Sequence, residues 1–136
     1  MKTEISIYIL FGILLIHWVG DFILQSDEQA KGKSKSNYFL TMHVLTYTSV
    51  WFFCCLAYSC IFYFQSIWSF TSQGTKFMFL FPAITFVCHW ITDYFTSRLN
   101  TRLHTKGDIH NFFVSIGFDQ ILHYVQLIIT FQLLTQ

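Results

Sequence analysis

Long hydrophobic stretches separated by short polar segments extend along the whole chain. Four of these stretches are long enough to cross about 30 Å of hydrocarbon as helices. They cover residues 5–25, 38–64, 77–96 and 112–134. The pattern predicts an all-α fold in which residues 1–136 form a single domain, an integral membrane bundle of four helices.

The composition supports a membrane protein and excludes other classes. Hydrophobic residues make up 54% of the 136 residues, aromatic residues 21% and charged residues only 11%, a profile that a soluble domain could hardly keep in solution. A net charge of +1 and the lack of a basic patch with interleaved aromatic residues give no support to nucleic-acid binding. The four cysteines lie within the predicted spans, and we interpret them as small apolar residues.

Basic residues are distributed unequally between the polar segments. Six of the eight lie after the first and third apolar stretches: Lys31, Lys33, Lys35, Arg98, Arg102 and Lys106. The other two are Lys2 and Lys76. Because cytoplasmic loops carry an excess of lysine and arginine, the two basic segments are predicted to be cytoplasmic and both termini to lie outside the cytoplasm.

Three short motifs place a histidine and an aspartate four residues apart within otherwise apolar stretches. They are His17 to Asp21, His89 to Asp93, and Asp119 to His123. Four residues correspond to about one helical turn, so each pair projects from one face of its helix. An aspartate at bilayer depth costs about 2.5–3.5 kcal/mol on insertion scales, so three of them require a compensating partner. A divalent metal ion would supply it.

The order of residues within the motifs follows the direction of the helices. In the predicted topology the first and third helices run inward and the fourth runs outward, and the fourth has the reversed order, aspartate before histidine. The histidines therefore form a deep layer and the aspartates a layer about 6 Å nearer the cytoplasm. His43 in the second helix lies near the same depth. The predicted metal ligands are His17, Asp21, His43, His89, Asp93, Asp119 and His123.

The ligand types bear on the identity of the bound group. Histidine and carboxylate suit Zn²⁺, which we favour, and also Mn²⁺ or Fe²⁺. Seven candidate ligands leave room for one ion or for two. Two other interpretations stay open, namely hydrogen bonding between helices and a b-type haem held by two histidines. The alignment of three pairs favours a metal site, and the aspartates would place negative charge beside an apolar macrocycle.

The first and third helices share a sequence pattern. Residues 17–22 read His-Trp-Val-Gly-Asp-Phe and residues 89–94 read His-Trp-Ile-Thr-Asp-Tyr. Each segment is followed by a basic loop and an outward helix. The bundle can therefore be interpreted as two parallel helical-hairpin repeats related by a pseudo-two-fold axis along the membrane normal.

Residues spread over nearly the whole chain resemble a known family. The pattern consists of His17, Asp21, Phe22, Leu24, Gln25, His43, His89, Asp93, Asp119, Gln120, Leu122 and His123. It resembles the small bacterial and phage membrane proteins grouped as domain of unknown function 3307, which are distantly similar to inner-membrane proteins labelled as metal-dependent hydrolases. The resemblance implies a multi-pass protein of the bacterial inner (cytoplasmic) membrane, and it carries over the ligand set together with Gln25 and Gln120.

The leading functional hypothesis is a membrane-embedded, metal-dependent hydrolase whose site opens toward the cytoplasmic leaflet. A location in the membrane implies membrane lipids as partners and a lipid or lipid-linked ester or phosphoester as substrate. The predicted catalytic residues are Asp21, Asp119 and His43. The predicted substrate contacts are Gln25, Gln120 and His110.

A non-enzymatic role is the alternative. The ion could be structural, or the polar residues could conduct a metal ion or protons. Four short helices enclose little space, so conduction would require a homo-oligomer. A structural site is coordinatively closed, whereas a catalytic site keeps an open position for water.

Overall fold

The computed structural model describes residues 5–62, 64–66, 69–70 and 72–135, and the fold within them is almost entirely helical. The elements in chain order are α1 (Ile7–Trp18), the π-helix η1 (Val19–Ile23), α2 (Asp27–Gly32), α3 (Asn37–Phe62), the strands β1 (Phe64–Ser66) and β2 (Ser69–Phe70), α4 (Ser72–Thr105) and α5 (Ile109–Thr135). The two strands pair antiparallel between α3 and α4. The prediction of an all-α fold is confirmed apart from this short pair.

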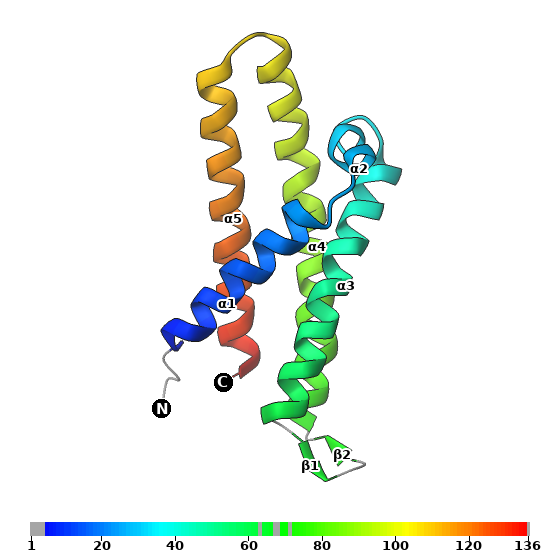
Figure 1. Ribbon diagram of the computed structural model, residues 1–136, viewed down its shortest axis with the longest axis vertical. Helices are drawn as coiled ribbons and strands as arrows, with labels where there is room; N and C mark the ends of the chain where they lie inside the picture. Colours follow the sequence, from blue (N-terminus) through cyan, green and yellow to red (C-terminus); the bar gives the residue numbers. More distant parts are fainter. Residues whose placement is uncertain (1–4, 63, 67–68, 71, 136) are drawn as a thin grey trace.

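Three long helices form the body of the molecule (Figure 1). α4 and α5 run antiparallel and are joined by a tight turn at one end, while α3 packs against α4. α1 lies obliquely across α5, and α2 lies beside the start of α3. The α2–α3 connection and the α4–α5 turn lie toward the same end, so the structure places the two basic segments together. Lys2 lies outside the described residues.

Three of the described helices, α3, α4 and α5, are long and apolar enough to cross a membrane. They correspond to the stretches predicted over 38–64, 77–96 and 112–134. The predicted first span, 5–25, forms a shorter apolar helix, Ile7–Ile23, whose last five residues are the π-helix η1. α4 is longer than predicted, and its 34 residues rise about 51 Å, well beyond about 30 Å of hydrocarbon.

The outer faces of the described helices are apolar, unlike those of a water-soluble bundle. Large apolar side chains such as Phe53 and Phe95 are exposed on the outer faces of the helices. An apolar core that includes Phe81 and Leu127 fills the half of the interior nearer the strand pair. The other half of the interior contains buried histidines and aspartates. An apolar exterior around a polar interior is expected of helices that are surrounded by lipid.

Side-chain hydrogen bonds fix the position of α2. Ser26 Oγ accepts a hydrogen bond from the Gln29 N–H at 3.2 Å, and Gln29 Oε1 accepts one from the Ser26 N–H at 3.1 Å, which forms a capping box. Gln29 Nε2 also donates to Thr46 Oγ1 on α3 at 3.2 Å. α2 is therefore held against α3, and Lys33, the residue that follows it, lies beside the polar half of the interior.

The turn between α4 and α5 has its own sequence determinants. Gly107 adopts a φ of 75°, a conformation that glycine reaches without steric cost. The Asp108 carboxylate accepts hydrogen bonds from the backbone N–H and the side-chain amide of Asn111. These hydrogen bonds lower the pKa of Asp108 below its ordinary value. The turn thus ends one helix and caps the next.

The two halves of the chain, which the sequence suggests are similar hairpins, differ in structure. α1 has 12 residues and α4 has 34. α1 continues into a π-helix and then into α2, whereas α4 is followed directly by the turn to α5. The two helices that share the sequence pattern therefore differ in length and in the elements that follow them.

Candidate metal centre

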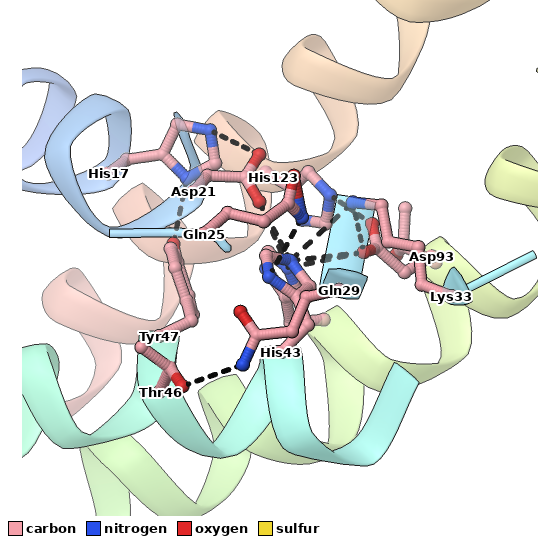
Figure 2. Close-up of polar contacts among 12 residues, drawn as sticks. His17, Asp21, Gln25, Gln29, Lys33, His43, Thr46, Tyr47, Asp93 and His123 are labelled. Carbon is pink, nitrogen blue, oxygen red and sulfur yellow. Dashed lines mark hydrogen bonds and ion pairs between the residues drawn. The ribbon is translucent and has the colours of Figure 1, made fainter. Parts of the chain in front are cut away.

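All seven predicted metal ligands are buried, each at most 7% exposed. His17 and Asp21 come from α1 and η1, His43 from α3, and the remaining four from α4 and α5. Their side chains meet in the polar half of the interior, where several dashed contacts converge in Figure 2. The structure thus brings together residues that are up to about a hundred positions apart in the chain.

Asp21 reaches this cluster because of the π-helix η1. A π-helix forms i→i+5 hydrogen bonds, and such turns are frequent at functional sites. The backbone at Gly20 lies so close to α3 that a Cβ atom there would come within 2.9 Å of Tyr47 Cδ2. This close approach places Asp21 Oδ1 3.0 Å from His43 Nε2. Glycine is therefore required at residue 20 to bring the η1 carboxylate to α3.

The first group of ligand atoms comes from Asp21, His43, His89 and Asp93. His43 Nε2 lies 3.3 Å from Asp93 Oδ2 and 3.2 Å from His89 Nε2. His89 Nε2 lies 3.5 Å from Asp21 Oδ1 and 3.6 Å from Asp93 Oδ2. One atom from each residue lies within 4.8 Å of the others, so the four could hold one ion.

A second group comes from Asp21, Asp119 and His123. His123 Nε2 lies 3.4 Å from Asp119 Oδ1 and 3.3 Å from Asp93 Oδ1. Asp21 thus belongs to both groups, and the two oxygens of Asp93 face histidines of different groups. The predicted layers of histidines and aspartates are interleaved at their side-chain ends, since the contacts between carboxylate oxygens and imidazole nitrogens measure 3.0–3.7 Å.

His17 lies beside these groups and is not a member of either within the described residues. Its Nδ1 lies 2.8 Å from Tyr47 Oη and its Nε2 lies 2.8 Å from Gln120 Oε1. Nε2–H can donate to Gln120 while Nδ1 accepts from Tyr47, so neutral His17 satisfies both contacts. Gln120 Nε2 in turn donates to Asp119 Oδ2 at 3.1 Å. In this arrangement His17 orients Gln120, and Gln120 orients a carboxylate of the second group.

The donor set fits a divalent cation. Among the described residues, the buried oxygens Asp21 Oδ1 and Asp119 Oδ1 accept no hydrogen bond, and their polar contacts are with imidazole nitrogens, at 3.0 Å from His43 and 3.4 Å from His123 respectively. Buried carboxylate oxygens without hydrogen bonds are costly unless a cation binds them. His43 Nδ1 contacts the Gln25 amide at 3.0 Å. If the amide oxygen faces Nδ1–H, the Nε2 lone pair is free for an ion, and Gln25 serves as the outer partner that metal-bound histidines usually have.

Lys33 adds a positive charge that the sequence analysis did not assign to the centre. Its Nζ lies 2.8 Å from Asp93 Oδ2 and 3.5 Å from His43 Nε2, and its side chain is 18% exposed. Burial alone would lower the pKa of Lys33, but the carboxylates of Asp93 and Asp21 outweigh burial and raise it. Three carboxylates and one ammonium leave a formal charge of −2 when the histidines are neutral, which one divalent ion would balance.

A cavity of about 600 Å³ connects the centre with the end of the molecule that holds the α4–α5 turn. Asp21, Asp119, Gln25 and Gln120 line it, so both predicted substrate-contacting glutamines lie where a ligand could reach them. His110 is exposed at the start of α5 and does not line this cavity. Its predicted role as a substrate contact stays a prediction.

Two residues of the centre were missed at the sequence level, and they differ in how they could have been found. Tyr47 follows His43 by four residues and therefore shares its helical face, and its ring stacks on His89 with the centroids 4.0 Å apart. The four-residue spacing from His43 could therefore have identified Tyr47 from the sequence. Lys33 follows the short helix α2 in a basic loop, and no spacing rule connects it to Asp93.

The comparisons with known proteins identify a family but do not indicate an activity. The family described as "Protein of unknown function (DUF3307)" matches residues 9–136, a range that contains every candidate ligand. Neither the curated proteins nor the solved structures gave a match. The expected similarity to metal-dependent hydrolases therefore stays a prediction.

Proposed function

This chain belongs to the DUF3307 family, and we propose that it is a membrane-embedded, metal-dependent hydrolase. Its substrate is a lipid or a lipid-linked ester or phosphoester at the cytoplasmic leaflet. All four apolar stretches are embedded in the bacterial inner membrane, with both termini outside the cytoplasm. The favoured ion is Zn²⁺, because imidazole and carboxylate groups predominate among the candidate ligands.

One observation carries this proposal. Asp21 and Asp119, whose Oδ1 atoms have no hydrogen-bond partner in the described part of the chain, also line the cavity that leads out of the centre. A structural ion would be enclosed by its ligands, whereas a catalytic ion needs a position that water and substrate can reach. The open cavity beside two carboxylates supports the catalytic alternative.

The chain provides the groups that hydrolysis requires. A bound divalent ion would supply a readily deprotonated water and polarise the ester or phosphoester. Asp119 Oδ1 accepts the proton of the attacking water as the water oxygen bonds to the carbonyl carbon or phosphorus. The same proton then passes to the leaving oxygen as its bond to that atom breaks. Gln120 holds the other oxygen of Asp119 in place during this transfer.

Metal content and turnover of the purified full-length protein test the proposal. The protein is prepared in detergent without chelators, its metals are quantified by elemental analysis, and it is incubated with bacterial membrane lipid extract. Because Asp21, His43, His89 and Asp93 could hold an ion without Asp119, Asp119→Asn should retain bound metal at that group and lose the release of head groups or acyl chains. Asp27→Asn is the matched control, because Asp27 is 93% exposed and does not itself line the cavity. It should retain both properties.

Two outcomes would contradict the hydrolase. Wild-type protein that contains no metal would remove the basis of the proposal. Fully metallated protein whose ion is saturated by side chains, and which consumes no lipid, would favour a structural or conducting role instead.

A further inference from the structure

A polar face of α4 leads from the metal centre to the α4–α5 turn. Asp93, Ser97, Asn100 and His104 follow one another at intervals of four, three and four residues, so they lie on one side of the helix. Ser97, Asn100 and His104 line the cavity beside the centre. These three residues do not belong to either group of candidate metal ligands.

Two atoms on this face are buried without a partner. Ser97 Oγ and Asn100 Oδ1 have no hydrogen-bond partner among the described residues, and Ser97 is only 7% exposed. A buried hydroxyl or amide without a partner destabilises the protein unless a ligand or water satisfies it. Rotation of the Asn100 amide would present its NH₂ group, so both side chains can act as donors to one polar ligand.

The segment between α2 and α3 brings positive charge to the cavity. Lys33 and Lys35 line it. The Lys33 ammonium has three donors, and its contacts to Asp93 and His43 leave one for a ligand. An anion would be repelled by Asp21 and Asp119 unless a divalent ion neutralised them.

We propose that this cavity binds the phosphate group of a membrane lipid, with Lys33, Ser97 and Asn100 as donors. This inference rests on the proposed function, since the bound ion removes the repulsion by the two carboxylates. It narrows the substrate from esters in general to phosphate-bearing lipids.

Apolar residues at the same cavity favour a lipid over free phosphate. Phe22, Phe112 and Ile116 line it together with the polar residues, and Phe22 is 48% exposed on the outer surface. A volume of about 600 Å³ accommodates a head group, while acyl chains can follow the apolar wall toward the surrounding lipid. Free phosphate would leave this wall without a partner.

Calorimetric titration of the zinc-loaded full-length protein in detergent tests the inference. The probes are dihexanoyl phosphatidic acid, dihexanoylglycerol and inorganic phosphate, and the metal content is measured first. Phosphatidic acid should bind at least about tenfold more tightly than dihexanoylglycerol, which lacks only the phosphate, and more tightly than inorganic phosphate. Removal of the metal with a chelator should abolish this preference. Equal affinity for phosphatidic acid and dihexanoylglycerol would overturn the inference, and equal affinity for inorganic phosphate would overturn its lipid part.

Variants locate the binding site. Lys33→Gln and Ser97→Ala should each weaken phosphatidic acid binding by roughly tenfold. Ser97→Ala should leave metal content unchanged and should not lower thermal stability, because its buried hydroxyl has no partner in the described structure. Lys106→Gln is the control, since Lys106 is exposed at the same end and does not line the cavity. Wild-type affinity in both test variants would refute the assignment.

The hydrolase and the phosphate site can fail separately. Phosphatidic acid binding without turnover of any lipid would leave the phosphate site intact and refute the hydrolase. Hydrolysis of lipids without preference for a phosphate group would refute the phosphate site and leave the hydrolase intact.

Discussion

Substitution of Gly20 by alanine tests whether the contact between η1 and α3 positions the metal centre. The new Cβ would lie 2.9 Å from Tyr47 Cδ2 and 3.3 Å from Tyr47 Cε2. The Tyr47 ring cannot move away easily, because it is fully buried and its face stacks on His89 with the centroids 4.0 Å apart. The Tyr47 hydroxyl is also bound to His17 Nδ1.

The expected cost follows from this crowding. Overpacking of a dense interior costs about 1–3 kcal/mol. The alanine also brings a gain of helix propensity of up to about 1 kcal/mol. Gly12→Ala on α1 measures that gain alone, because its new Cβ has no atom within 4 Å apart from its chain neighbours and the adjacent backbone of α1. Gly20→Ala should therefore be less stable than Gly12→Ala by about 1–3 kcal/mol, and it should bind less metal because Asp21 adjoins the displaced residue.

Thermal unfolding in detergent, followed by circular dichroism, compares the two variants with the wild type, and elemental analysis measures their metal. Equal stability and equal metal content in Gly20→Ala and Gly12→Ala would show that Tyr47 yields to the new methyl group. In that case the close approach of η1 to α3 would not be what places Asp21.

Four further changes have defined outcomes. His89→Ala should lose bound metal and lower stability, because the buried carboxylates of Asp21 and Asp93 would be left without an ion, either charged or forced to protonate; unchanged metal content would remove His89 from the ligand set. A reporter fused at Gln136 should be active outside the cytoplasm, and cytoplasmic activity would overturn the predicted topology. Ser26→Ala should lower stability by about 0.5–2 kcal/mol through loss of the α2 cap, measured by chemical denaturation. Hydrogen bonds from Asn111 lower the pKa of Asp108 in the folded protein, so the ionised carboxylate should stabilise the fold at neutral pH. This stabilisation should disappear as the pH falls from 3.8 toward the lowered pKa of the folded state. Acid unfolding of Asp108→Ala should lack this contribution.

The long helices could be predicted from the sequence because their signal is simple. The length of an apolar run determines whether a helix can cross a membrane, and α3 and α5 follow the predicted stretches closely, whereas α4 extends beyond its stretch at both ends. The end of the first helix could not be predicted in the same way. Residues 19–23 are as apolar as the helix before them apart from Asp21, and nothing in their spacing indicates i→i+5 hydrogen bonds.

The candidate site could be predicted to the extent that helical periodicity defines it. His89 and Asp93 project from one face of α4, and Asp119 and His123 from one face of α5, so their spacing placed them correctly in the interior. The relation between His17 and the other ligands depends on Tyr47 and Gln120, which are long-range contacts. Such contacts depend on how the helices pack against one another, and the spacing of residues in a single sequence does not predict that packing.

Lys33 places a cation of the chain's own at the candidate metal centre. Any ion that enters competes with this ammonium, which already lies 2.8 Å from Asp93 Oδ2. Mg²⁺ and Ca²⁺ prefer oxygen ligands and gain little from the neighbouring imidazoles, whereas Zn²⁺ gains strong bonds to nitrogen. If the proposed centre binds an ion, competition from the chain's own lysine should therefore penalise abundant hard cations more than zinc, and a single loop residue would contribute to ion selectivity.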